Sequence, residues 1–120
     1  MSLHESAEMY LETIYVLSKK TGSVRSIDVA EDMGYSKPSV SRAVSLLKQG
    51  GYLVMEEDGS LKLTESGKIA AKKIFERHTV LSDFLKHIGV SPQTATTDAC
   101  KIEHVISDET VLAIKNFLEK

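Results

Sequence analysis

Along most of this chain, apolar side chains recur every three or four residues, the spacing that gives a helix one buried face. Two short runs, at residues 52–55 and 61–63, are strand-like instead, and an Asp-Gly pair between them is typical of a hairpin tip. Residues 88–97 contain a glycine and a proline and indicate a loop. The pattern therefore predicts a mainly α fold with one β-hairpin. Helices are expected over residues 6–20, 26–33, 36–50, 64–87, 100–105 and 108–118.

Signals at the helix ends indicate a helix-turn-helix followed by a wing. Ser26 is predicted to cap the first of two adjacent helices, and Gly34 is predicted to close that helix in the left-handed conformation. Ser36 is the predicted N-cap of the second helix, where Pro38 fits the first turn because no N–H is needed there. A hairpin directly after the second helix is the wing of a winged helix-turn-helix. Thr64 is expected to cap the long helix that follows the wing.

Composition narrows the class of protein. At 120 residues and 42% hydrophobic content, the chain suits one domain, or one small domain with a helical extension. No apolar run approaches the roughly 18 residues of a membrane span, so no membrane partner is expected. A single cysteine excludes an intramolecular disulfide framework and fits a cytoplasmic protein. The net charge of −2 argues against a strongly basic nucleic-acid binder, but residues 19–50 are basic, so any DNA-binding footprint would be local.

The start of the second helix is the candidate DNA-reading segment, because the N-terminal residues of that helix meet base edges in a helix-turn-helix. Hydroxyl groups there can contact phosphate or base, free N–H groups can hold a phosphate, and Arg42 can read guanine. The same serines and proline would also form an ordinary helix start without DNA. The order of helix, turn, helix, hairpin and long helix favours DNA binding. The candidate DNA-binding residues are Arg25, Ser36, Lys37, Pro38, Ser39, Ser41 and Arg42.

A second candidate site is centred on Cys100, Glu103 and His104, which stand at i, i+3 and i+4 and would leave one face of a helix within a single turn. A thiolate, a carboxylate and an imidazole together suit a divalent first-row metal such as Fe²⁺, Mn²⁺, Co²⁺ or Zn²⁺. Met9 and Glu12 share a face of the first helix by the same spacing. Each has a plain alternative, since methionine and cysteine are common in cores and carboxylates on surfaces.

Five segments match the motifs of one family, in the right order and over nearly the entire chain: 7–15 (AEMYLETIY), 36–41 (SKPSVS), 63–67 (LTESG), 77–78 (RH) and 98–105 (DACKIEHV). In these segments the chain resembles the iron- and manganese-dependent repressors typified by the diphtheria toxin repressor and the manganese transport repressor. The resemblance implies a winged helix-turn-helix DNA-binding domain over residues 1–66 and a helical metal-binding and dimerisation domain over residues 67–120. It also implies a two-domain form without the SH3-like domain of longer members.

The metal ligands are likewise implied by the resemblance. The implied set is Met9, Cys100, Glu103 and His104 for one ion, completed by a backbone carbonyl and water, with His78 in a nearby second site. Its two sulfur atoms resemble the iron branch and favour Fe²⁺. Glu12 resembles the manganese branch instead, where this carboxylate joins a paired-metal site. Mn²⁺ is therefore possible, and other divalent first-row metals could substitute in vitro.

Two departures from the iron branch affect the second site. Ser82 stands where iron-branch proteins usually carry a carboxylate, and Thr96 stands where they carry a further histidine. A second site from Glu12 and His78 is therefore expected rather than an iron-type one. His87 matches no ligand position and is expected at the surface, as is the N-terminal His4.

The function that the resemblance implies is a metal-dependent transcriptional repressor that controls metal homeostasis. An ion held by the first helix and the Cys100 segment would set the spacing of two recognition helices in a homodimer on double-stranded operator DNA. Two alternatives remain open: a winged-helix regulator that senses oxidants through Cys100, with a vestigial metal site, and a metalloenzyme using the same ligands. No enzyme and no small organic substrate is expected, since the sequence offers no general base beyond the ligands.

Overall fold

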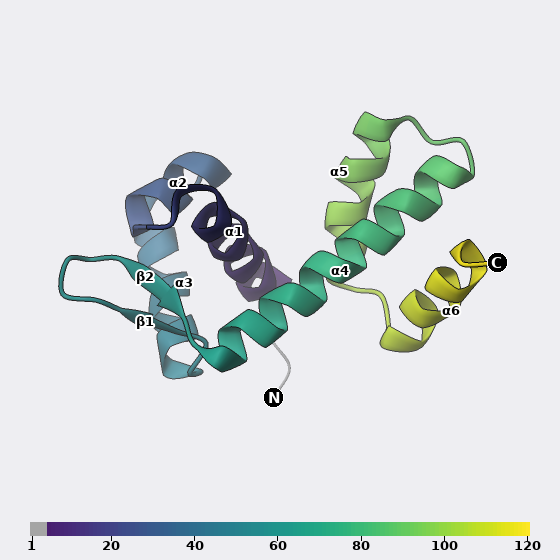
Figure 1. Cartoon of the computed structure of the whole chain (residues 1–120). Helices are drawn as coiled ribbons and strands as arrows, with labels where there is room; N and C mark the ends of the chain where they lie inside the picture. Colours follow the sequence, from purple (N-terminus) through teal and green to yellow (C-terminus); the bar gives the residue numbers. More distant parts are fainter. Residues whose placement is uncertain (1–4) are drawn as a thin grey trace. The chain divides into compact units, whose positions relative to one another are not determined.

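The computed structural model describes residues 5–120 and is mainly helical, as predicted (Figure 1). Six helices and one two-stranded antiparallel sheet make up this described part. The chain divides into two compact units, one ending at Lys72 and one running from Lys73 to Lys120. Helix α4 (Glu65–His87) contributes to both units. No described helix is long and apolar enough to cross a membrane.

The first unit contains the predicted helix-turn-helix. It consists of α1 (Glu5–Thr21), α2 (Ser26–Met33) and α3 (Lys37–Gln49), followed by the hairpin. The apolar stripes of the three helices meet in one core, whose most deeply buried side chains are Leu11, Ile14, Val29, Val40 and Leu47. These are the positions that the three- and four-residue spacing selects, so the amphipathic pattern accounts for this packing.

The caps of the two middle helices differ in how well the sequence predicts them. Ser36 caps α3 as predicted, since its hydroxyl accepts a hydrogen bond from the Ser39 N–H at 3.3 Å. Gly34 ends α2 in the left-handed conformation, with φ of 71°, also as predicted. The N-cap of α2 was predicted wrongly: it is Arg25, and Ser26 is the first helical residue. The Asp28 carboxylate accepts a hydrogen bond from the Arg25 backbone N–H at 2.9 Å. The N-cap therefore lies one residue before the predicted one.

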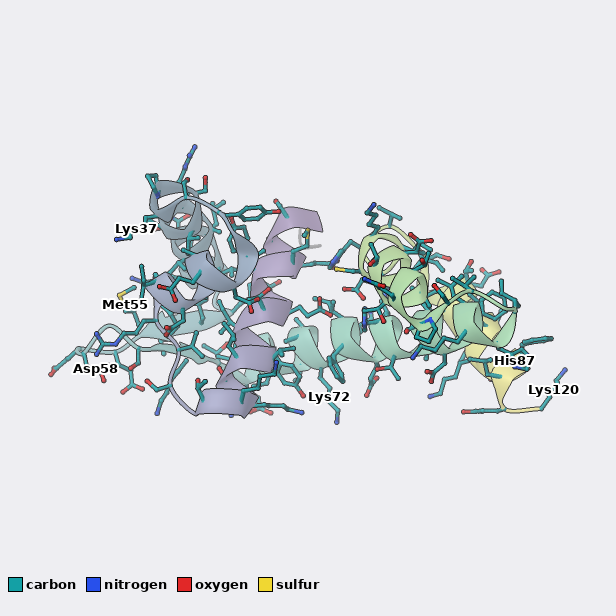
Figure 2. The ribbon with its side chains drawn as sticks, turned by 90° about the horizontal axis from the view of Figure 1, so that it is seen from above. Lys37, Met55, Asp58, Lys72, His87 and Lys120 are labelled. Carbon is teal, nitrogen blue, oxygen red and sulfur yellow. The ribbon has the colours of Figure 1, made fainter. Side chains whose placement is uncertain are left out.

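The wing is the hairpin of β1 (Leu53–Met55) and β2 (Leu61–Leu63), which pair antiparallel with Leu53 opposite Leu63. Figure 2 labels Asp58 at its tip, where the carboxylate accepts the Ser60 N–H at 2.9 Å. That hydrogen bond holds the pKa of Asp58 below its ordinary value. A bridge between Val24 and Leu61 joins the hairpin to the segment before α2. The wing is therefore attached to the helix-turn-helix.

A close backbone approach joins the wing to α4. The Thr64 hydroxyl caps α4 as predicted, accepting the Gly67 N–H at 3.1 Å while donating to the Gly51 carbonyl at 2.6 Å. A Cβ at Gly67 would lie 1.9 Å from the Tyr52 carbonyl oxygen. Only glycine fits at this position, because a Cβ atom would overlap the backbone of Tyr52, directly before β1.

The second unit contains the end of α4, then α5 (Pro92–Ile102) and α6 (Asp108–Leu118). The bounds of α6 were predicted correctly, but the predicted loop over 88–97 is too long and the predicted helix over 100–105 is displaced. Helix α5 begins at Pro92 because Ser91 caps it, accepting the Thr94 N–H at 3.4 Å. Ala95 and Ala99 provide its buried stripe. Alanine pairs are a weak hydrophobic signal, which is why the pattern missed this helix.

Candidate functional site

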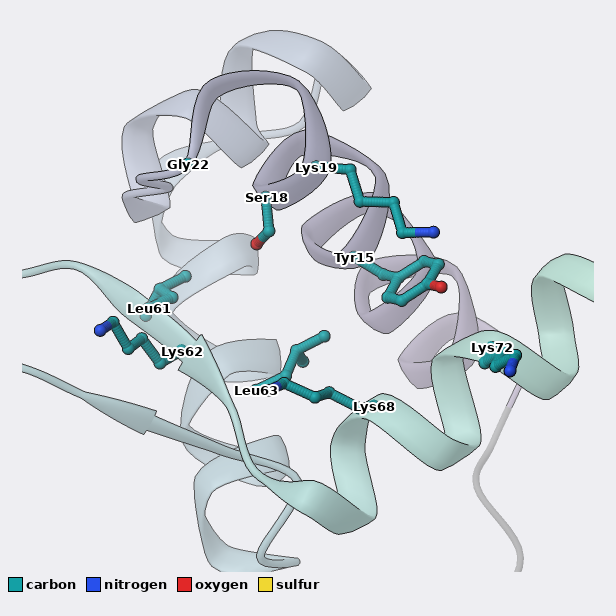
Figure 3. A pocket seen from close by; sticks show the side chains of 9 residues that line it. All are labelled: Tyr15, Ser18, Lys19, Gly22, Leu61, Lys62, Leu63, Lys68 and Lys72. Carbon is teal, nitrogen blue, oxygen red and sulfur yellow. The ribbon is translucent and has the colours of Figure 1, made fainter.

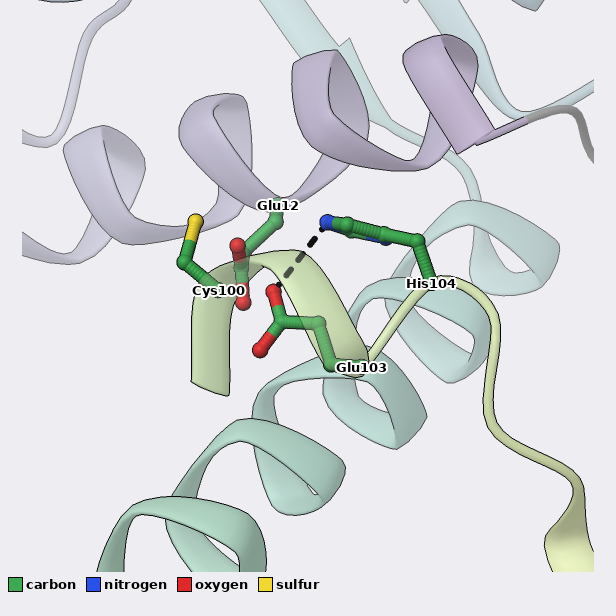
Figure 4. Close-up of side chains that lie close together, drawn as sticks. All are labelled: Glu12, Cys100, Glu103 and His104. Atoms are coloured by element: carbon green, nitrogen blue, oxygen red, sulfur yellow. Dashed lines mark ion pairs between the residues drawn. The ribbon is translucent and has the colours of Figure 1, made fainter. Parts of the chain in front are cut away.

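Cys100, Glu103 and His104 come together at the C-terminal end of α5. Cys100 lies in the last turn of the helix, Glu103 is its C-cap and His104 follows in the turn. Glu103 keeps helical dihedral angles (φ −58°, ψ −24°), so the spacing of i, i+3 and i+4 still directs the three side chains to one side. One ligand atom from each lies within 4.8 Å of those of the other two (Figure 4). Thiol, carboxylate and imidazole thus form one donor set.

The Glu103 carboxylate is the centre of this group. Its side chain is 0% exposed, and it lies between two imidazoles: Oε2 is 2.8 Å from His78 Nδ1, and Oε1 is 3.2 Å from His104 Nε2. A buried carboxylate is expensive unless it has partners, and here each oxygen faces a ring nitrogen. We call His78, Cys100, Glu103 and His104 the ligand cluster. All four belong to the second unit.

Arg77 holds the segment that carries the ligand cluster. Its Nη1 donates to the carbonyls of Glu103 at 3.0 Å and Ile106 at 3.2 Å, and its Nη2 pairs with the Asp108 carboxylate. Lys73 also pairs with Asp108, at 3.1 Å. The hydrogen bond from Arg77 is the main cause that lowers the pKa of Asp108, and the hydrogen bond from Lys73 lowers it further. Residues 103–108 are thereby attached to α4 through Arg77, the residue directly before His78.

This role of Arg77 was not predicted from the sequence. Arg77 was noted only as the neighbour of His78 in a matching segment. The available signal was Asp108, an acid in the first turn of a capped helix, which can pair with a base on an earlier helix. Which base it would meet depends on how α6 packs on α4, and that is a tertiary property.

The remaining predicted ligands lie in the first unit. Met9 and Glu12 are both half-buried on α1, next to the buried Tyr10 and Leu11. The Met9 carbonyl accepts the Thr13 hydroxyl at 2.9 Å. Glu12, also drawn in Figure 4, belongs to α1 and not to the unit of the ligand cluster. The structure thus unites four of the six predicted ligands within one unit.

Two other histidines were expected at the surface. His87 is exposed, and its ring contacts Phe117 with a centroid separation of 5.9 Å. His4 lies outside the described residues.

The candidate DNA-binding residues surround the start of α3. Ser39 is half-buried; the exposed members of the set are Arg25, Ser36, Lys37, Pro38, Ser41 and Arg42. Tyr35, which the sequence reasoning missed, is 45% exposed directly before the Ser36 cap. Its ring centroid lies 5.9 Å from that of Tyr10 on α1. Burial is the main cause that raises the pKa of Tyr10, and the nearby Tyr35 hydroxyl raises it further. An aromatic residue between a helix-closing glycine and an N-cap is the signal that was available.

Comparison with known proteins gives two family matches. The N-terminal DNA binding domain of iron dependent repressors matches residues 2–61, and their metal binding and dimerisation domain matches residues 64–120. An uncharacterized HTH-type transcriptional regulator of Methanocaldococcus jannaschii is 33% identical over 120 residues, covering 98% of this chain and 96% of that protein. The transcriptional regulator MntR of Escherichia coli O157:H7 is 34% identical over 116 residues, covering 97% of this chain and 75% of that protein.

Solved structures agree with the sequence matches. The manganese regulator SloR is similar with a TM-score of 0.84 and 28% identity, over 99% of this chain and 55% of that chain. A manganese-dependent transcriptional repressor in complex with manganese has a TM-score of 0.87 and 28% identity, over 94% of this chain and 52% of that chain. This chain therefore spans about half the length of these two solved regulators.

Proposed function

Because the chain belongs to the family of iron-dependent repressors, we propose that it binds operator DNA as a homodimer and represses transcription when it holds a divalent metal ion. Its relatives are transcription regulators, which agrees with the expectation that it is no enzyme. The metalloenzyme and the oxidant-sensing alternatives receive no support from these relatives. The observation that carries the proposal is the ligand cluster, which lies in the segment matched by the metal binding and dimerisation domain.

The donor set of the ligand cluster fits a divalent first-row metal, since it combines a thiol, a carboxylate and imidazoles. We assign Cys100, Glu103 and His104 to one ion, with Met9 of α1 as the fourth side chain, and His78 with Glu12 to a second. When bound, the ion supplies positive charge that offsets the carboxylates and the thiolate. Met9 and Glu12 are on the helix that precedes the DNA-reading segment. Ligands from α1 would therefore connect the metal to the DNA-binding domain over residues 1–66.

The second half of the proposal concerns the metal-binding and dimerisation domain over residues 67–120. Several large apolar side chains in this region are exposed, and they include Phe75, Ile88, Val105, Leu112 and Phe117. Such an area of exposed apolar surface is typical of a protein–protein interface. A symmetric dimer would place two α3 helices at a set spacing, as two half-sites on duplex DNA require. In each half-site, the serines and Lys37 would contact backbone while Arg42 reads a base.

Of the candidate metals, we propose Fe²⁺ as the favoured ion and Mn²⁺ as the competing one. The two sulfur donors, Met9 and Cys100, support Fe²⁺ because soft ligands bind the harder Mn²⁺ weakly. Glu12 and the relatives named for manganese support Mn²⁺. The protein would act in the cytoplasm, where operator DNA and the labile metal pool meet.

The test is operator binding under anaerobic conditions. A fluorescent duplex, selected from random sequences by the metal-loaded protein, is titrated with protein at increasing Fe²⁺ or Mn²⁺, and anisotropy is measured. We expect DNA affinity to rise with metal, and Fe²⁺ to act at lower free concentration than Mn²⁺. Equal DNA affinity with and without metal would refute the switch. If Mn²⁺ acts at a lower free concentration than Fe²⁺, only the proposed preference for Fe²⁺ is overturned.

A variant pair separates the ligand assignment from the preference. Cys100→Glu replaces the thiol by a carboxylate and should shift the response toward Mn²⁺, because the soft donor is lost. Lys101→Glu changes charge at the exposed neighbouring position and is the matched control. Co²⁺ serves as a spectroscopic probe: its thiolate charge-transfer absorption should be present in the parent protein and in Lys101→Glu, and absent in Cys100→Glu. Absence of that absorption from the Co²⁺-loaded parent protein would remove Cys100 from the ligands, because the chain has no other cysteine.

A further inference from the structure

A cavity of about 550 Å³ opens in the first unit, between the C-terminal half of α1, the strand β2 and the first turns of α4 (Figure 3). Tyr15 and Leu63 contribute apolar surface to it. Four lysines line it: Lys19, Lys62, Lys68 and Lys72. Among the described residues, no acidic side chain lines it. The volume falls within the roughly 300–1,000 Å³ typical of small-ligand sites. We call this space the lysine cavity.

The charges of the lysine cavity are arranged around an apolar centre. Lys19 Nζ lies 4.5 Å from the centre of the Tyr15 ring, so this ammonium group is held over an aromatic face. Lys68 and Lys72 are one turn apart on α4 and share a face of that helix. Lys62 pairs with Glu56 at 3.0 Å, and in Figure 3 it extends away from Tyr15. Lys68 and Lys72 of α4 therefore supply positive potential beside the apolar surface.

Neighbouring ammonium groups repel one another, and an anion among them relieves that repulsion. The apolar surface adds a second requirement, because a simple inorganic anion would make no use of the apolar part of the lining. A molecule that fits both properties carries an acidic group on an apolar body. The acidic group would meet the lysines in charge-assisted hydrogen bonds, and the apolar body would cover the ring and the leucine.

A DNA phosphate is the competing explanation for a group of lysines. The position of the cavity argues against it. Figure 2 shows Lys37, at the start of α3, and Lys72, at the cavity, projecting from different sides of the first unit. A duplex read by the start of α3 would approach from the Lys37 side. The lysine cavity is therefore separate from the proposed DNA-binding residues.

We propose that the lysine cavity binds a small organic anion, a carboxylate or phosphate attached to an apolar body, as a bound effector that undergoes no reaction. Its lining comes from α1, the wing and α4, so a bound anion contacts all three elements and stabilises the first unit by mass action. The site does not depend on the metal switch, since none of its lining residues is a proposed metal ligand.

The test uses the intact chain and 1-naphthoate as the probe, followed by ¹H–¹⁵N correlation spectra. Saturable shifts are expected at residues 15–22, 61–63 and 68–72. The uncharged analogue 1-naphthalenemethanol should bind at least roughly fivefold more weakly, because it lacks the anion. Inorganic phosphate should also bind more weakly, because it lacks the apolar body. Equal affinity of the naphthoate with either reference compound overturns the proposed ligand class.

Variants locate the site. Lys68→Gln with Lys72→Gln keeps two good helix formers at exposed positions and should weaken 1-naphthoate binding roughly fivefold or more. Lys20→Gln removes one positive charge next to the cavity without touching its lining and should leave the affinity unchanged. Unchanged binding in the double variant, with native-like spectra, refutes the proposal. Shifts by a duplex DNA at the same residues, without shifts at α3, would assign the surface to nucleic acid instead and also refute it.

Discussion

The start of α3 and the end of α5 carry the two candidate functions, and they are built in opposite ways. At the start of α3, polar residues at the surface form hydrogen bonds over three positions, as exposed Ser36 does with half-buried Ser39. At the end of α5, a fully buried carboxylate meets a histidine 25 residues away. An exposed side chain such as Arg42 can be removed from a surface helix start at little cost to stability, whereas a buried ionisable group cannot be removed so cheaply. Changes at the two regions should therefore have distinguishable effects.

The largest effect is expected at the buried carboxylate. Glu103→Ala removes the carboxylate that faces the ring nitrogens of His78 and His104, and a buried polar group that loses its partner costs roughly 1–3 kcal/mol. The free energy of unfolding, measured in urea without metal, should fall by that order, and metal-dependent DNA affinity should be lost. Glu76→Ala, at an exposed position of α4, should change neither. A stability loss under about 1 kcal/mol would mean that the contacts of Glu103 do not hold the buried cluster.

A moderate effect confined to function is expected at the start of α3. Arg42→Ala should weaken operator binding by about 1–3 kcal/mol and relax specificity at one base pair, because we propose that this arginine reads a base. Unfolding in urea should stay within about 0.5 kcal/mol of the parent, since Arg42 is exposed. Lys20→Ala, on α1, is the charge-matched control. If Arg42→Ala reduces affinity equally for every sequence, its contact is with phosphate rather than with a base.

A smaller effect on stability is expected at the cap of the same helix. Ser36→Ala removes the acceptor of the Ser39 N–H, and losing an N-cap costs about 0.5–2 kcal/mol. Ser36→Asp keeps the cap but adds a negative charge at the DNA surface. It should retain stability while weakening DNA binding. Equal stability of both variants would show that the cap contributes nothing, and equal DNA binding would remove Ser36 from the interface.

The smallest effect is a pH dependence at Asp108. Its pKa in the folded protein lies below the ordinary value of 3.8, because Arg77 and Lys73 donate to the carboxylate. Its contribution to stability is thus present above the ordinary value and is lost as the pH falls through the lower folded pKa. Asp108→Asn should flatten the acid limb of the stability curve relative to Glu109→Gln, an exposed neighbour. An unchanged acid limb would mean that the ion pair is too screened to matter.

The two regions also differ in how far the sequence predicted them. The cap at Ser36, the turn at Gly34 and the bounds of α6 were all predicted, because each depends on residues within one or two turns. The start of α2 was placed one residue late, since Asp28 could reach back to the backbone of Arg25. The start of α5 was missed, because two alanines give too weak a pattern to mark a buried face.

In the candidate metal site, the spacing of Cys100, Glu103 and His104 already placed three donors on one side of a helix end. His78 entered the prediction only through the resemblance. Arg77 was missed altogether, although it donates to two carbonyls of the segment that carries the site. His78 and Arg77 both lie on α4. The sequence around Cys100 does not indicate which turn of α4 packs against the Cys100 segment.

The sequence by itself therefore determined the order of the helices, the wing and the exposed polar start of α3, and its motifs carried the resemblance to the family. The helices, the wing and the start of α3 follow from periodicity, capping and spacing, which act over a few residues. Only the tertiary structure decided that Glu103 is buried between His78 and His104, that Arg77 holds the following turn, and that lysines of α1, β2 and α4 line one cavity. Each of these depends on the packing of elements distant in sequence, whose mutual placement is set by side-chain volume and burial rather than by local pattern.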